Sequence, residues 1–157
     1  MNVVSKKPII GGIILAVIVG IIFVGAQINP DNPENINVVF HVTLADPALY
    51  DDKGLYNDFF ILEKGVYEFR FVPNGDSPTT LSIELWIIKA GNEKWRHFSE
   101  DFELQGTLVE DELSSWYVWD YLGEKRIIFD ESYTMEIVIS PNRNLVGPVS
   151  IDLIKLR

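Results

Sequence analysis

The chain has 157 residues, 47% of them hydrophobic and 12% aromatic, and a net charge of −10. This length and hydrophobic content suit one compact domain with attachments and exclude global disorder. The 13 basic residues include Lys6 and Lys7, so 11 basic residues and all 23 acidic residues follow the long apolar run, a net charge of −12 for that part. So acidic a surface repels polyanions, and no nucleic-acid partner is expected. The absence of cysteine excludes disulfides and thiolate metal sites.

The first thirty residues contain a segment long enough to cross a membrane. No charge occurs from Pro8 to Pro30, and a helix over residues 8–28 is about 31 Å long, which matches a hydrocarbon core of about 30 Å. Because lysines stay inside, residues 1–7 are predicted to be a cytoplasmic tail and residues 8–28 a transmembrane signal anchor in the lipid bilayer. An alternative remains open, in which a signal peptide is cleaved after Ala26. Both interpretations place the remaining chain outside the cytoplasm.

Two further features accompany this segment. Gly12, Ala16 and Gly20 recur every four residues, so they share one helix face that another transmembrane helix can approach closely. The alternative is that small residues are simply common in membrane helices. Residues 29–37 contain two Asn-Pro pairs and are rich in Asp and Asn, so they are predicted to form an extended linker.

After residue 37 the sequence changes to a pattern of period two. Apolar and polar side chains alternate in segments that turn-forming residues separate, as in "GVYEFRFVPNGD", which is typical of strands with one buried face. The residues expected to face the core are Tyr67, Phe69, Phe71, Leu81, Ile83, Leu85, Ile87, Tyr133, Met135, Ile137, Ile139, Val149, Ile151 and Leu153. Since every such face needs a cover, residues 38–157 are predicted to form an all-β, antiparallel β-sandwich, jelly-roll-like, of about eight or nine strands.

The segments "FFILEKGVYEFRF" and "SYTMEIVIS" carry a resemblance to known domains. Their outline resembles that of two kinds of small extracytoplasmic sandwich, the pre-peptidase C-terminal domains and the GOLD-type domains of membrane trafficking proteins. The resemblance covers about 90 residues and implies an accessory or binding role without catalysis. It includes no motif that matches position by position, so it assigns no functional residue.

Four aspartates gather in "ADPALYDDKGLYND", namely Asp46, Asp51, Asp52 and Asp58. Loops rich in carboxylate oxygens bind calcium, although this spacing does not match an EF-hand. The alternative is a solvated acidic loop, and no other cofactor is expected.

The sequence offers little for catalysis. His41 and His97 are its only histidines, and no Gly-x-Ser-x-Gly turn occurs. A hydrolase whose site is not visible in the sequence stays as an alternative.

The stretch "SSWYVWDYLG" is the strongest candidate for a contact site. As a strand it places Trp116 and Asp120 on one face, and Tyr117, Trp119 and Tyr121 on the other. Aromatic side chains of this kind fill sandwich cores, form the centres of protein contacts, or stack against sugar rings. We name Trp116, Trp119, Tyr121 and Asp120 as candidate ligand or partner contacts.

These observations together favour a single-pass protein of the cell membrane with its N-terminus inside. Its outer domain is expected to act as a non-catalytic accessory or interaction module, with a membrane protein as partner and as a subunit of a larger complex. The alternative is a surface module that binds a glycan or another ligand.

Overall fold

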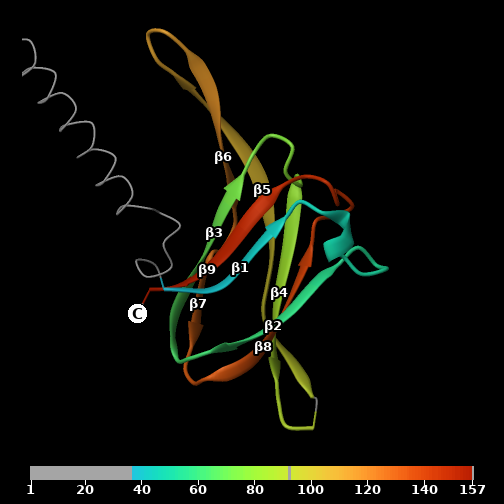
Figure 1. The fold of residues 1–157 in the computed structure, drawn as a ribbon. Helices are drawn as coiled ribbons and strands as arrows, with labels where there is room; N and C mark the ends of the chain where they lie inside the picture. The colour runs from blue at the N-terminus through green and yellow to red at the C-terminus, as the bar shows by residue number, and fades with distance from the viewer. Residues whose placement is uncertain (1–36, 92, 157) are drawn as a thin grey trace, which may run out of the picture. The chain divides into compact units, whose positions relative to one another are not determined.

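A computed structural model describes residues 37–91 and 93–156 of the chain. This part contains nine strands and one 3₁₀ helical turn, as Figure 1 shows. The elements are β1 (Val38–Leu44), η1 (Pro47–Leu49), β2 (Tyr56–Leu62), β3 (Gly65–Pro73), β4 (Thr80–Ile88), β5 (Lys94–Glu110), β6 (Ser115–Leu122), β7 (Arg126–Phe129), β8 (Tyr133–Ser140) and β9 (Val149–Lys155).

The strands form two antiparallel sheets. One sheet has the order β1-β9-β3-β7 and the other the order β2-β8-β4-β5-β6. Strands β1 to β4 therefore alternate between the sheets as the chain proceeds. The predicted all-β fold with antiparallel sheets is confirmed, and the number of strands is the upper value of the prediction.

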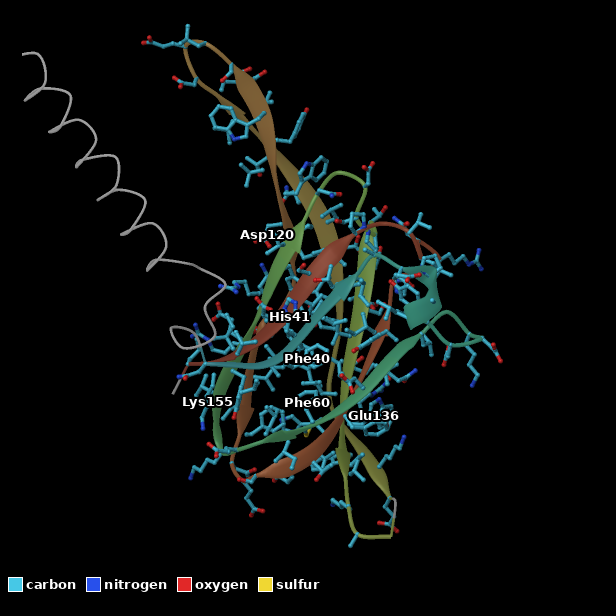
Figure 2. The ribbon with its side chains drawn as sticks, in the orientation of Figure 1. Phe40, His41, Phe60, Asp120, Glu136 and Lys155 are labelled. Carbon is cyan, nitrogen blue, oxygen red and sulfur yellow. The ribbon has the colours of Figure 1, made fainter. Side chains whose placement is uncertain are left out.

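The core lies between the two sheets and follows from the period-two pattern. In β4, Leu81, Ile83, Leu85 and Ile87 are at most 2% exposed, while the residues between them are partly exposed. Burial of each such side chain contributes about 1.5 to 3 kcal/mol to the free energy of folding. Aromatic rings join the sheets: the centroids of Phe40 and Phe60 lie 5.1 Å apart, and both side chains are labelled in Figure 2. The expected core faces of β3, β4, β8 and β9 are confirmed, with Tyr133 only partly buried.

Strand β5 extends far beyond its neighbour β4. Its 17 residues pair with β4 only up to Glu103, whereas Glu103–Glu110 pair with β6. The outer part is consequently a two-stranded hairpin that projects beyond the other strands, in gold and orange in Figure 1. The turn of this hairpin lies within the stretch "LVEDELSSW".

Several predicted features lie outside the described residues. These are the tail 1–7, the anchor 8–28, residues 29–36 of the linker, and the small residues Gly12, Ala16 and Gly20. Within the ranges that the structure describes, no helix has the length and hydropathy needed to cross a membrane.

Candidate interaction site on the β5–β6 hairpin

One face of the hairpin passes gradually from the core to the surface. Along β6, Tyr121 is fully buried, Trp119 is half-buried and Tyr117 is 56% exposed. Their cross-strand partners on β5 are Leu104, Gly106 and Leu108. This face of β6 is therefore covered by the opposite sheet at the base of the hairpin and is exposed to solvent near its tip.

Tyr121 anchors the base of the hairpin. Its hydroxyl donates a hydrogen bond of 2.5 Å to the carbonyl oxygen of Pro78, and its ring packs edge-on against Phe71, with the centroids 5.2 Å apart. Burial raises the pKa of the Tyr121 hydroxyl well above its ordinary value, with a smaller contribution from Tyr50. Tyr121 was predicted as a contact residue, but its side chain lies in the core and positions the hairpin.

Trp119 occupies a space that two glycines leave open. A Cβ atom on Gly106 would lie 2.7 Å from the indole ring, and one on Gly75 would lie 3.2 Å from it. The ring also stacks with that of Tyr117 at a centroid distance of 5.6 Å. Glycine in a strand interior often marks such a close approach. Trp119 is thus held in place, with Tyr117 stacked on its outer side.

On the opposite face of the hairpin, the side chains of β6 are exposed. Trp116 and Val118 are 47% and 50% exposed. Asp120 follows at the base, where Figure 2 labels it, and accepts hydrogen bonds of 2.8 Å from Lys125 and from the backbone amide of Tyr121. The structure therefore leaves Trp116 exposed and engages Asp120 within the chain.

The tip adds an exposed apolar side chain and a concentration of negative charge. Leu113 is 96% exposed, in a turn closed by the Asp111 amide, which donates to the Ser114 carbonyl at 2.8 Å. Residues 99–124 include eight acidic residues and no lysine or arginine. The hairpin can consequently offer tryptophan, valine and leucine side chains to a partner within a strongly negative surround. Large aromatic side chains of this kind dominate the energetics of protein contacts.

The four aspartates of the predicted calcium loop make separate local contacts. Asp46 accepts from a backbone amide at the start of η1, Asp51 accepts from two amides of the following turn, and Asp58 accepts from the hydroxyl of Tyr56. Asp52 is exposed. In residues 37–91 and 93–156, no group of three or more His, Cys, Asp or Glu side chains is arranged to hold a metal. Calcium binding stays a prediction.

A polar cluster that the sequence did not indicate lies on the outer face of the other sheet. His41 Nδ1 donates to Asp152 Oδ1 at 2.6 Å, and Arg70 donates to Asp152 Oδ2 at 2.5 and 3.0 Å. Thr43 Oγ1 lies 3.5 Å from His41 Nε2 but only 2.9 Å from the hydroxyl oxygen of Ser150. Thr43, His41 and Asp152 are of the residue types that serve as nucleophile, base and acid in hydrolases. Here, however, they lie on the face of a sheet, on the paired strands β1 and β9. We interpret the cluster as stabilising the sheet.

The charge of Asp152 is expected to stabilise the fold above acidic pH. Burial by itself raises the pKa of this carboxyl, but the bonds from His41 and Arg70 outweigh it and leave the pKa lowered. This stability is present above the unfolded pKa of about 3.9 and is lost as the pH falls through the folded pKa. Asp152→Asn is therefore expected to lower the free energy of unfolding at pH 7 by about 1.5 to 3 kcal/mol.

The measurement is urea unfolding of the full-length chain at pH 7 and near pH 2. The difference between Asp152→Asn and the unmodified chain should shrink at the lower pH. Glu63→Gln, which removes an exposed carboxylate paired with Lys155, is the control with little expected change. An equal difference at both pH values would contradict this role of the Asp152 charge.

Comparisons with known proteins do not assign this chain to a family. No family model matches it, and no curated protein matches it. A crystal structure of a protein from Sulfurospirillum deleyianum is similar over 75% of this chain and 98% of that chain, with 7% identity and a TM-score of 0.39. That similarity is too distant to carry a functional argument.

Proposed function

We propose that the protein is a non-catalytic accessory module that binds a protein partner through the β5–β6 hairpin. The observation that carries the proposal is the hairpin itself: it projects beyond the sandwich and exposes Trp116, Val118 and Leu113. Exposed apolar side chains that gather on one element are typical of interaction sites. Tryptophan in particular is enriched at the centres of protein interfaces.

The proposal places this module outside the cytoplasm, attached to the cell membrane. Its support is the uncharged run of residues 8–28 with Lys6 and Lys7 before it. Such an anchor holds the domain near the bilayer, which raises its effective concentration toward other membrane proteins. A membrane-protein partner, as a neighbouring subunit of a larger complex, is therefore the partner that we propose.

We also propose that the domain is a jelly roll with one added strand. The order in which the strands alternate supports this: β1, β3, β7 and β9 share one sheet, and β2, β4, β5 and β8 share the other. In that description β6 is the additional strand, and within the part of the chain that the structure describes it pairs only with β5. The element that carries the proposed function is then an extension of the fold and not part of its basic frame.

Glycan binding is the second candidate function. The specific observation in its favour is the Tyr117 ring, which is 56% exposed and stacked on Trp119. A sugar ring packs against exposed aromatic faces of this kind. A glycan array with the full-length chain tests it, and binding that depends on Tyr117 and not on Trp116 would favour this second candidate over a protein partner.

Trp116→Ala is expected to reduce the recovery of native partners by about thirtyfold, because truncating a central aromatic contact costs about 2 kcal/mol or more. The measurement is quantitative chemical cross-linking in native membranes with the full-length chain. Trp95→Ala is the matched control, since Trp95 is 58% exposed but lies at the start of β5, away from the hairpin. Equal recovery with Trp116→Ala and Trp95→Ala would contradict the proposed function.

A further inference from the structure

We infer that the partner binds by adding a β-strand to the free edge of β6, and that the added strand is a basic, extended segment. This inference rests on the proposed function, since it specifies how the hairpin holds a protein partner. Among residues 37–91 and 93–156, β6 is the last strand of its sheet, with β5 on one side and no strand paired on the other. A strand in this position presents unpaired backbone groups to which another chain can bind.

The hydrogen bonds at the base of the hairpin fix which backbone groups point outward. The Leu104 amide donates toward the β4 side, to the carbonyl of Thr79 at 2.8 Å, so it points away from β6. Leu104 is paired with Tyr121, whose amide donates to Asp120 Oδ1 at 2.8 Å and so points away from β5. Alternate residues of an antiparallel strand point the same way. The amides of Tyr117 and Trp119 therefore also point outward from the free edge.

The outer half of this edge lacks the protection found on the edge strands β2 and β7. At the base of β6 the Asp120 carboxylate covers the Tyr121 amide, and on the edge strand β2 the Asp58 carboxylate covers the Phe59 amide in the same way, at 2.7 Å. Strand β7 has only four residues. Edge strands are commonly protected by such charges and by shortness.

Residues 115–119 lack such protecting charges. They contain no charged residue and no proline, and they consist of Ser115 and four aromatic or β-branched residues, which favour strands. In the described ranges, no backbone hydrogen bond outside the β5–β6 pairing reaches residues 115–119. This stretch is consequently open to a further strand.

The charge of the hairpin identifies the chemistry of the occupant. Residues 99–124 carry eight carboxylate side chains and no lysine, arginine or histidine. A segment in which lysine or arginine alternates with β-branched residues would complement this charge and the exposed Trp116 and Val118. A second copy of the chain would instead bring two acidic hairpins together, which repels.

Proline at position 117 separates edge pairing from side-chain contact. Tyr117→Ala and Tyr117→Pro both remove the aromatic ring, but only Tyr117→Pro removes the outward amide and places a bulky ring on the edge. Because that amide does not bond to β5, an edge proline is compatible with the β5–β6 pairing. Partner recovery by cross-linking, with the full-length chain, is expected to fall about tenfold further with Tyr117→Pro than with Tyr117→Ala.

The two proposals fail in different ways. Equal recovery with Tyr117→Pro and Tyr117→Ala, while Trp116→Ala loses the partner, would overturn edge pairing and leave the proposed function standing. Full recovery with Trp116→Ala and with both Tyr117 variants would overturn the proposed function as well.

Amide hydrogen exchange gives a second readout that needs no variant. The probe is an eight-residue peptide of alternating lysine and valine, added to the full-length chain. Exchange is expected to slow at the Tyr117 and Trp119 amides and to stay unchanged at Val118, whose amide already bonds to β5. A peptide of alternating glutamate and valine should have no effect. Equal slowing by both peptides, or slowing that rises with protein concentration without peptide, would overturn the assignment of a basic segment.

Discussion

Replacing Tyr121 by alanine is expected to lower the free energy of unfolding by about 3 to 5 kcal/mol, as for other buried aromatic residues. The side chain is fully buried, packs on Phe71 and donates its hydroxyl to Pro78. Its loss leaves a cavity and a buried carbonyl without its partner. The variant tests whether the hairpin is anchored in the core.

Two further variants separate the contributions at this position. Tyr121→Phe keeps the ring and removes the hydrogen bond, so a loss of about 1 to 3 kcal/mol is expected. Tyr117→Ala removes an exposed ring from the same face of the hairpin, and its cost should stay under about 1 kcal/mol. Urea unfolding of the full-length chain, followed by tryptophan fluorescence, measures all three. A cost below 1 kcal/mol for Tyr121→Ala would show that the base of the hairpin is not part of the cooperative core.

Removing the outer half of the hairpin is expected to abolish partner binding without unfolding the domain. The variant replaces residues 108–117 with an Asn-Gly turn that joins Thr107 to Val118. These two residues face each other across β5 and β6 and, by the alternation described above, form a hydrogen-bonded pair. A two-residue Asn-Gly turn suits such a pair because it matches the twist of the flanking strands.

The fold should survive because the deleted residues make few core contacts. Leu113, Trp116 and Tyr117 are about half exposed or more, and the core residues Phe102 and Tyr121 remain in place. The melting temperature is therefore expected to stay close to that of the unmodified chain. The same deletion removes Trp116 and most of the open edge of β6, so the expected loss of binding exceeds that of Trp116→Ala alone.

The alternation of apolar and polar residues correctly predicted the buried side chains of strands that have one face in the core. In β3, Tyr67, Phe69 and Phe71 were expected to share the inner face, and all three are buried. The same holds for β4 and β9. A period of two is informative there because the opposite sheet covers one side of the strand and water covers the other.

The long strand β5 did not follow from the sequence. Its segment carries carboxylates at Glu100, Asp101 and Glu103, and only Phe102 among its residues is fully buried. The outer residues face solvent on both sides, so no alternation marks them as a strand. In the described residues, these positions pair with β6 alone, and such pairing is not visible in a local sequence pattern.

The candidate site was predicted in part for the same reason. The two faces of "SSWYVWDYLG" were assigned correctly, with Trp116 opposite Tyr117, Trp119 and Tyr121. Which of them are covered depends on where β5 passes the end of the sandwich. The contact between His41 and Asp152 could not be predicted from the sequence. These residues are 111 positions apart, and the pairing of β1 with β9 brings them together.

Cross-linking of the hairpin-shortened chain in native membranes is the decisive test of whether the β5–β6 hairpin binds the partner. The full-length chain and the variant with residues 108–117 replaced are compared at equal abundance, with the melting temperature as the check on folding. The partners captured by the unmodified chain are expected to be absent from the variant, while its melting temperature is retained. Undiminished capture by a folded, shortened variant would contradict the role of the β5–β6 hairpin as the interaction site.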